Sequence, residues 1–137
     1  MKTVVLDTSV TVAWYLPESF ASNARHWQTA LLDGEVRGIV PRLHYAELAN
    51  VLRTHVKRRA LAPELAEEIW RLHLDAPLET LEPTRGNLLA TALEYQATAY
   101  DAVFISLALE LDASLVTAER STTPWVVRLA ECVEAVR

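Results

Sequence analysis

Four acidic residues stand at comparable places in the sequence, and together they suggest a chemistry. Asp7 ends the first apolar run, and Glu119 comes two residues after a later one. Glu47 lies early in a segment with helical periodicity, and Asp101 opens another such segment. Carboxylates that converge repel one another and acquire raised pKa values unless a divalent cation compensates their charge. Mg²⁺ prefers such oxygen ligands and bridges to phosphate oxygens, so the four acids point to chemistry on a phosphate group.

The elements that would bring these acids together alternate between strand and helix. Strands are predicted at residues 3–6, 38–40, 78–81, 114–117 and 133–136, with 125–129 competing for the last place. Helices are predicted at residues 8–16, 19–32, 42–59, 63–74, 86–95 and 101–111. This alternation predicts an α/β fold whose mainly parallel sheet is covered by helices on both faces. Strand C-termini and helix N-termini then share one edge, where ligands of such folds bind.

Composition predicts a single domain that spans residues 1–137. The chain is 51% hydrophobic and 23% charged, which is enough apolar material for a real core. Cys132 is the only cysteine, so an internal disulfide and a cysteine metal cluster are both excluded. The four histidines lack the spacing of zinc ligands; they are His26, His44, His55 and His73. No apolar run has the length of a signal peptide or a membrane span, so the expected location is the cytoplasm.

Each of the four acids also has an ordinary structural explanation. Asp7 is suited to cap the helix that follows it. Asp101 is suited to cap its own helix, and Glu119 fits a surface turn. Glu47 is expected in solvent from periodicity alone, opposite an apolar face made of Tyr45, Leu48, Ala49, Leu52 and Val56. Only the edge that the four acids would share favours a metal site over four unrelated roles.

Four segments, taken in order, resemble the motifs of PIN domains. They are Val4 to Val10 around Asp7, Pro41 to Leu52 around Glu47, Ala99 to Ala102 around Asp101, and Leu115 to Glu119. Their order and spacing match across nearly the whole chain. Within that family the chain resembles the VapC-type ribonuclease toxins of bacterial toxin–antitoxin pairs.

The resemblance implies a PIN-like three-layer sandwich with a five-stranded sheet in the order 3-2-1-4-5. It also implies one or two Mg²⁺ or Mn²⁺ ions, endonucleolytic cleavage of RNA, a homodimer, and inhibition by a cognate VapB-like antitoxin. Asp7, Glu47 and Asp101 carry over as catalytic residues and metal ligands. Glu119 departs from the pattern, because the family usually has aspartate there; the longer side chain reaches the metal directly, through water, or not at all.

Three hydroxyl residues match polar positions of the family, namely Thr8, Ser9 and Thr117. They are predicted to orient a carboxylate or a metal-bound water. Helix capping also explains Thr8 and Ser9, and strand propensity also explains Thr117. The expected reaction is metal-assisted hydrolysis of a phosphodiester, which by family analogy leaves 5′-phosphate and 3′-hydroxyl ends.

The net charge of −5 argues against a simple nucleic-acid-binding module, which usually carries a basic surface. Two bound divalent cations would offset most of that charge. A basic cluster late in one predicted helix is expected to contact RNA phosphates, and it consists of Arg53, Lys57, Arg58 and Arg59. A solvated helix end, where cations are favourable, explains the same cluster equally well.

The aromatic residues Trp14, Tyr15 and Phe20 are candidates for a groove that receives an antitoxin helix, or for core or dimer contacts. At least one of them is expected in the core. A phosphoacceptor receiver domain is excluded, because it needs a lysine near the late strands and the only lysines are Lys2 and Lys57. The remaining alternative is a non-catalytic PIN-like module that binds RNA or protein, which an assay of metal dependence distinguishes from an enzyme.

Overall fold

A computed structural model describes residues 1–137 and contains one sheet of five parallel strands. The strands are β1 (Lys2–Leu6), β2 (Val36–Val40), β3 (Leu78–Thr80), β4 (Ser114–Thr117) and β5 (Val133–Ala135). Their spatial order is β3-β2-β1-β4-β5, as the resemblance implied. The competing strand at 125–129 is wrong, because those residues form a helix that begins at Pro124. Proline favours the first position of a helix, since its missing N–H has no partner there in any case.

Helices fill the connections between the strands. They are α1 (Thr8–Val12), α2 (Ala21–Leu32), α3 (Arg42–Lys57), α4 (Pro63–Leu74), α5 (Leu88–Tyr95), α6 (Ala99–Glu110) and α7 (Pro124–Leu129), with the 3₁₀ turns η1 (Arg85–Asn87) and η2 (Ala130–Cys132). The first helix was predicted to reach residue 16 but ends at Val12. The chain turns at residues 13–15, ahead of Pro17, and a residue that precedes proline is disfavoured in a helix.

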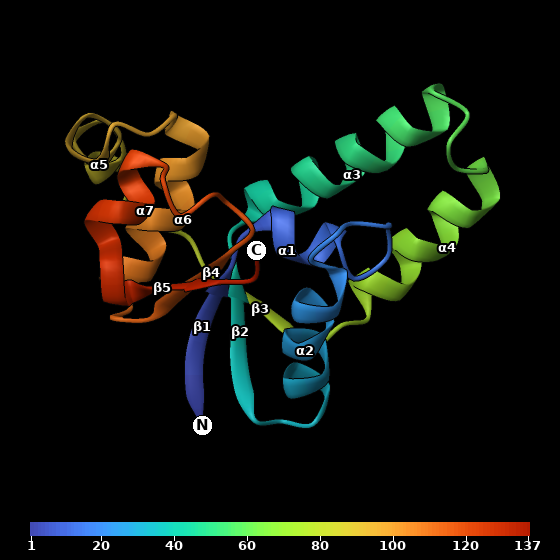
Figure 1. Ribbon diagram of the computed structural model, residues 1–137, viewed down its shortest axis with the longest axis horizontal. Helices are drawn as coiled ribbons and strands as arrows, with labels where there is room; N and C mark the ends of the chain where they lie inside the picture. Colours follow the sequence, from blue (N-terminus) through green and yellow to red (C-terminus); the bar gives the residue numbers. More distant parts are fainter.

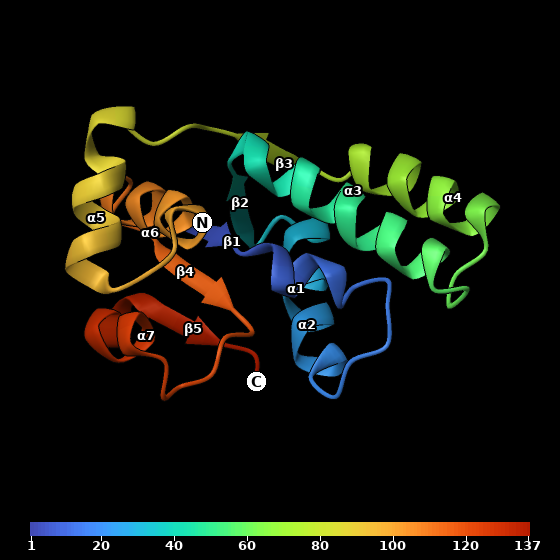
Figure 2. The same ribbon diagram turned by 90° about the horizontal axis from the view of Figure 1, so that it is seen from above.

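The sheet lies between two layers of helices, so the predicted three-layer arrangement is confirmed (Figures 1 and 2). Successive residues of a strand point to opposite faces. Val4 and Leu6 of β1 pack in a core with residues of α1 and α2, whereas Val5 packs in a second core with residues of α6 and α7. The central strand therefore carries apolar side chains on both sides, as a buried parallel strand should.

Helices α3 and α4 form an antiparallel hairpin that projects beyond the sheet, and both views show them side by side (Figures 1 and 2). The base of this arm is held by a third core, in which Leu48 and Leu52 of α3 and Ile69 of α4 meet Val12 and Leu16. The tip of the arm is the connection at residues 58–62. The base of the arm is thus packed against α1, and its tip extends away from the sheet.

The carboxyl ends of the strands and the first turns of the following helices meet at one edge of the sheet. Asp7 connects β1 to α1, Pro41 connects β2 to α3, and β4 ends at Thr117. Because β1 is the central strand, with β2 and β4 beside it, Asp7 stands in the middle of this edge. None of the helices has the length and apolar character needed to cross a membrane.

Candidate active site

Two hydroxyl groups hold the carboxylate of Asp7. Its Oδ2 accepts hydrogen bonds from Thr117 Oγ1 at 2.8 Å and from Ser9 Oγ at 3.0 Å. Burial raises the pKa of Asp7 and the charge of Asp101 raises it further, while the two hydroxyls act in the opposite direction. Asp7 occupies the N-cap position of α1, but its side chain makes no capping hydrogen bond. Capping therefore does not account for this carboxylate.

Glu47 lies half-buried in α3 and reaches toward α1. Its Oε1 accepts a hydrogen bond of 2.7 Å from Thr8 Oγ1. Burial raises the pKa of Glu47, and the charges of Asp7 and Asp101 add to that rise against the Thr8 hydrogen bond. The solvent-exposed position expected from periodicity is wrong, since Glu47 shares its environment with two of the other acids.

Asp101 lies in the first turn of α6, with its side chain half-buried. Its backbone N–H donates to Thr98 Oγ1 at 3.1 Å, so Thr98 is the N-cap and the capping role considered for Asp101 is wrong. Burial raises the pKa of Asp101, and the charge of Glu119 raises it further. Electrostatic repulsion therefore links Asp101 to the three other acids of the edge, Asp7, Glu47 and Glu119.

Glu119 is half-buried just beyond β4 and is engaged by its own loop. Its Oε1 accepts hydrogen bonds from Thr123 Oγ1 at 3.1 Å and from the Arg120 N–H at 3.2 Å. Its charge acts on Asp101, so it lies at the same edge as the other acids. The hydrogen-bond partners of its carboxylate are nevertheless local.

The three hydroxyl residues singled out from the sequence all contact this acidic edge. While Ser9 Oγ donates to Asp7, it accepts the Ala118 N–H at 3.1 Å. Thr117 Oγ1 likewise donates to Asp7 and accepts the Glu119 N–H at 3.0 Å. These two side chains tie the start of α1 to the end of β4, with the Asp7 carboxylate between them.

No lysine or arginine neutralises the four acids. The ion pairs of the molecule lie elsewhere and are Lys2–Glu134, Arg37–Glu79 and Arg128–Glu94. Four carboxylates without a cationic partner are a donor set that fits a hard divalent cation such as Mg²⁺ or Mn²⁺. As the side chains stand, no three of them are arranged to hold an ion. The oxygens of Glu47 and Glu119 are instead engaged by Thr8 and Thr123.

Sequence reasoning missed a buried pair of histidines behind the acids. His44 of α3 and His73 of α4 are fully buried, and their Nε2 atoms lie 2.7 Å apart. Tyr15 Oη lies 2.7 Å from His73 Nδ1. The signal was the spacing of four residues that places His44 on one face with Leu48 and Leu52, the buried residues of α3. The predicted apolar face began at Tyr45 and did not include His44.

The basic cluster and the aromatic group lie apart from the acids. Arg53, Lys57, Arg58 and Arg59 are exposed along the outer part of α3 and its C-terminus. Ten residues of helix separate Lys57 from Glu47, a rise of about 15 Å. Trp14 is the expected core residue, 6% exposed, with its indole N–H donated to the Ala24 carbonyl at 2.9 Å. Tyr15 and Phe20 are half-buried against the same core.

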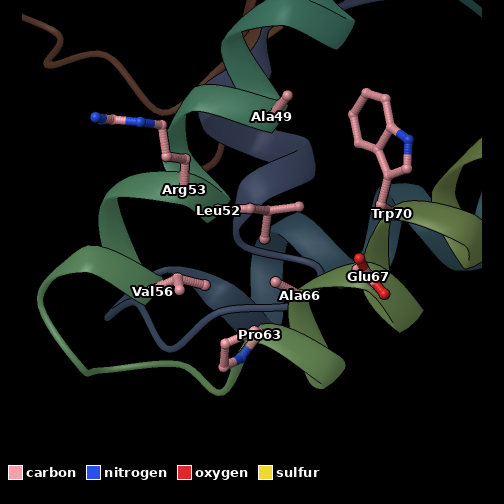
Figure 3. A pocket seen from close by; sticks show the side chains of 8 residues that line it. All are labelled: Ala49, Leu52, Arg53, Val56, Pro63, Ala66, Glu67 and Trp70. Carbon is pink, nitrogen blue, oxygen red and sulfur yellow. The ribbon is translucent and has the colours of Figure 1, made fainter.

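An apolar groove runs between the two helices of the arm (Figure 3). In Figure 3, Trp70 of α4 stands across from Ala49 and Leu52 of α3, and the Arg53 side chain points away from it. The groove has a volume of about 360 Å³ and carries Glu67 on its α4 side. Trp14, Tyr15 and Phe20, around which a groove was predicted, do not line it. Trp14 and Tyr15 line two other pockets of about 670 and 260 Å³, and Phe20 lines neither of these.

Comparison with known proteins finds a PIN domain profile that matches residues 4–121. Ribonuclease VapC3 of Pyrobaculum aerophilum is 27% identical over 121 residues, which is 85% of this chain and 89% of that protein. The crystal structure of PAE2754 from the same organism has a TM-score of 0.66 at 18% identity and covers 98% and 90% of the two chains. VapBC2 from Rickettsia felis, solved with a DNA fragment from their promoter, has a TM-score of 0.64 at 15% identity and covers 97% and 98%. At these identities the two structures support the fold alone.

Proposed function

The chain belongs to the PIN-domain family, and from that premise we propose that it is a Mg²⁺- or Mn²⁺-dependent endoribonuclease, the toxin of a toxin–antitoxin pair. The observation that carries this proposal is the acidic edge itself. Asp7, Glu47 and Asp101 have raised pKa values, and no cationic side chain compensates them. A cluster that is electrostatically unfavourable by itself becomes favourable around a divalent cation.

Asp7 and Asp101 are the proposed direct ligands, because Asp7 stands in the middle of the edge and the charge of Asp101 acts on it. Glu47 binds the same ion directly or through water, and Glu119 helps to recruit a second one. A bound divalent cation supplies a water of lowered pKa and a Lewis acid for the phosphodiester. Ser9 and Thr117 fix the direction in which Asp7 presents its remaining lone pairs, and Thr8 does the same for Glu47.

RNA is the proposed substrate, and the basic cluster of α3 is its proposed backbone contact. A strand seated at the acids would have to run along α3 for about 15 Å to reach Lys57, a few nucleotides of chain. Contacts of this kind position a substrate without reading its sequence. The neighbouring cations at Arg58 and Arg59 have no acidic partner within ion-pair distance.

Partners are proposed from the relatives. A toxin–antitoxin complex from Klebsiella pneumoniae has a similar fold, and ribonuclease VapC3 shares the VapC name with the toxins that the sequence resembles. By extension, a cognate VapB-like antitoxin neutralises this chain, which acts as a homodimer. The α3–α4 groove, lined by Leu52, Val56 and Trp70, is the proposed docking site for an antitoxin helix, and the pocket beside Trp14 and Tyr15 is the site predicted from the sequence.

Cleavage of RNA by the purified protein tests the proposed function. The expected result is endonucleolytic cleavage in Mg²⁺ or Mn²⁺ that stops on addition of EDTA. A PIN-like binding module would retain RNA without cutting it in any metal. Cleavage that continues unchanged in EDTA would contradict the metal-dependent mechanism.

A further inference from the structure

A continuous chain of hydrogen bonds runs from Glu47 into the protein interior and ends at Tyr15. Glu47 Oε1 contacts Thr8 Oγ1 at 2.7 Å, and the same Thr8 oxygen lies 3.2 Å from His44 Nδ1. His44 Nε2 then meets His73 Nε2 at 2.7 Å, and His73 Nδ1 meets Tyr15 Oη at 2.7 Å. The chain joins α1, α3 and α4, the three helices that meet at the base of the arm.

The number of protons available fixes the direction of every link. A carboxylate only accepts hydrogen bonds, so the Thr8 hydroxyl must donate its single proton to Glu47. The Thr8 oxygen then has to accept from His44, which places the His44 proton on Nδ1.

A neutral imidazole has one N–H, so His44 Nε2 accepts and His73 must carry its own proton on Nε2. His73 Nδ1 is left to accept from the Tyr15 hydroxyl. Every donor and acceptor of the chain is satisfied in this one arrangement.

The surroundings keep both imidazoles neutral. His44 and His73 are fully buried, and rings of Trp14, Tyr15 and Tyr45 pack around them. Burial lowers the pKa of His44 to about 3, with a further contribution from His73, and lowers the pKa of His73 to about 4. Two neutral histidines provide the alternation of donor and acceptor that the chain requires.

We propose that His44, His73 and Tyr15 are positioning residues that act through Thr8, locking its hydroxyl toward Glu47 and so fixing the Glu47 carboxylate at the acidic edge. The metal-related part of this inference rests on the proposed function. Without the His44 N–H, the Thr8 oxygen has an open acceptor site and its hydroxyl is free to rotate away from Glu47. Groups that orient a ligand in this way commonly alter metal affinity when they are removed.

Imidazole ¹⁵N NMR of the Mg²⁺-loaded full chain tests the chain directly. The expected result is a neutral His44 with its proton on Nδ1 and a neutral His73 with its proton on Nε2. The four histidines are assigned by comparison with single variants. A His44 that carries its proton on Nε2 would overturn the proposal, because Thr8 would then have to donate to His44 and could not donate to Glu47.

Mn²⁺ binding measured by electron paramagnetic resonance tests the consequence for Glu47. His44→Leu is expected to weaken Mn²⁺ affinity by roughly tenfold, the lower end of the range for groups that support a metal ligand. His44→Asn is expected to restore most of the affinity, because its amide nitrogen replaces Nδ1 as a donor to Thr8. His55→Leu is the matched control, since His55 lies in the same helix but its Nδ1 contacts the Val51 carbonyl.

Affinity in folded His44→Leu equal to that of wild type would overturn the proposal, as would a loss of equal size in His55→Leu. If His44→Leu does not fold, Thr8→Val replaces it. Without a Thr8 hydroxyl to accept from Nδ1, His44 is expected to lose its fixed tautomer, and an unchanged tautomer is the contrary result. Wild-type protein that binds no Mn²⁺ would overturn the proposed function. The tautomers of His44 and His73 would still test the hydrogen-bond chain.

Discussion

In one region of this molecule the surroundings lower the pKa of an acidic side chain, and in another region they raise it. On the first two strands from one side of the sheet, Glu79 of β3 pairs with Arg37 of β2, and the hydrogen bond from that arginine lowers the pKa of the glutamate. At the carboxyl edge of the sheet, the side chains that hydrogen-bond Asp7 are the hydroxyls of Ser9 and Thr117, which carry no charge, and burial raises the pKa of Asp7. Both regions belong to the same parallel sheet.

The two regions differ in whether a positive charge lies beside the carboxylate. A protein can neutralise a carboxylate with a nearby arginine, as it does at Glu79. At the edge, hydroxyls satisfy hydrogen bonds without supplying positive charge, so the electrostatic cost of burying the acids is retained. Binding of a divalent cation, as we propose, would remove that cost and would couple the stability of the fold to occupation of the site.

Neutralising one acid from each region should have its largest effect on catalysis. Asp101→Asn is expected to reduce RNA cleavage by at least about a hundredfold, since even groups that merely support metal ligands cost about 10–100-fold. Glu79→Gln removes the same unit of charge outside the site and should leave the cleavage rate unchanged. Single-turnover rates in Mg²⁺ measure both variants. An active, folded Asp101→Asn would remove that residue from the site.

The cations of the basic cluster lie apart from the acids, so they should act on RNA binding and not on the chemical step. Lys57→Gln, Arg58→Gln and Arg59→Gln combined should raise KM and leave kcat intact. The dependence of log affinity on log salt should fall by about 2, since each contact to a single-stranded phosphate contributes about 0.7. RNA binding measured over a series of salt concentrations checks this. An unchanged salt slope would assign these residues to a solvated helix end.

Glu119 tests how far the acidic edge extends. If it helps to hold a second ion, Glu119→Gln should lower the cleavage rate by about tenfold and shift the Mg²⁺ dependence. Glu119→Asp should remain active, because it restores the side chain that the family usually has. Superimposable Mg²⁺ titrations of wild type and Glu119→Gln, with a stability change within about 0.5 kcal/mol, would leave Glu119 as a loop residue.

The pH dependence of stability should have opposite signs in the two regions. The folded-state pKa of Asp7 is raised above 3.8, so its contribution to stability is full below that pH and is lost as pH rises through the raised value. Asp7→Asn should therefore gain stability over metal-free wild type as pH increases. The folded-state pKa of Glu79 is lowered from 4.5, so its contribution is present above that pH and lost in acid.

Glu79→Gln should accordingly lose a little stability relative to wild type as pH increases. Urea unfolding in EDTA from about pH 4 to about pH 8 measures both differences. The effect at Glu79 should be the smaller one and should shrink further in salt, because its ion pair is exposed. Slopes of the same sign for the two variants would contradict the contrast.

The sequence predicted the sheet and the acids because both depend on simple periodic rules. Val4, Val5 and Leu6 are apolar in succession, which is typical of a strand buried on both faces. The acids were found by their place after strands and at helix starts, and the order of such places along a parallel sheet determines one common edge. The local end of α1 was harder to predict, because its turn depends on packing of Trp14 against α2 as well as on Pro17.

The hydrogen-bond chain through His44 and His73 could not be predicted in the same way. His44 and His73 are 29 positions apart, and their contact depends on how α3 and α4 pack as a hairpin. Histidine is as compatible with a surface as with a core, so its burial is decided by partners that a linear pattern does not contain. Thr98 was missed as the N-cap for a related reason, since Asp101 three residues later is also a suitable capping residue.

Titration of the metal-free protein with Mn²⁺, for wild type, Asp7→Asn and Glu79→Gln, is the most direct test of the acidic edge. Electron paramagnetic resonance measures the free ion at each step. Saturable binding by wild type and Glu79→Gln, with none by Asp7→Asn, is the predicted result. Equal binding by Asp7→Asn and wild type, or no binding by wild type, would contradict the assignment of this edge as a metal-dependent nuclease site.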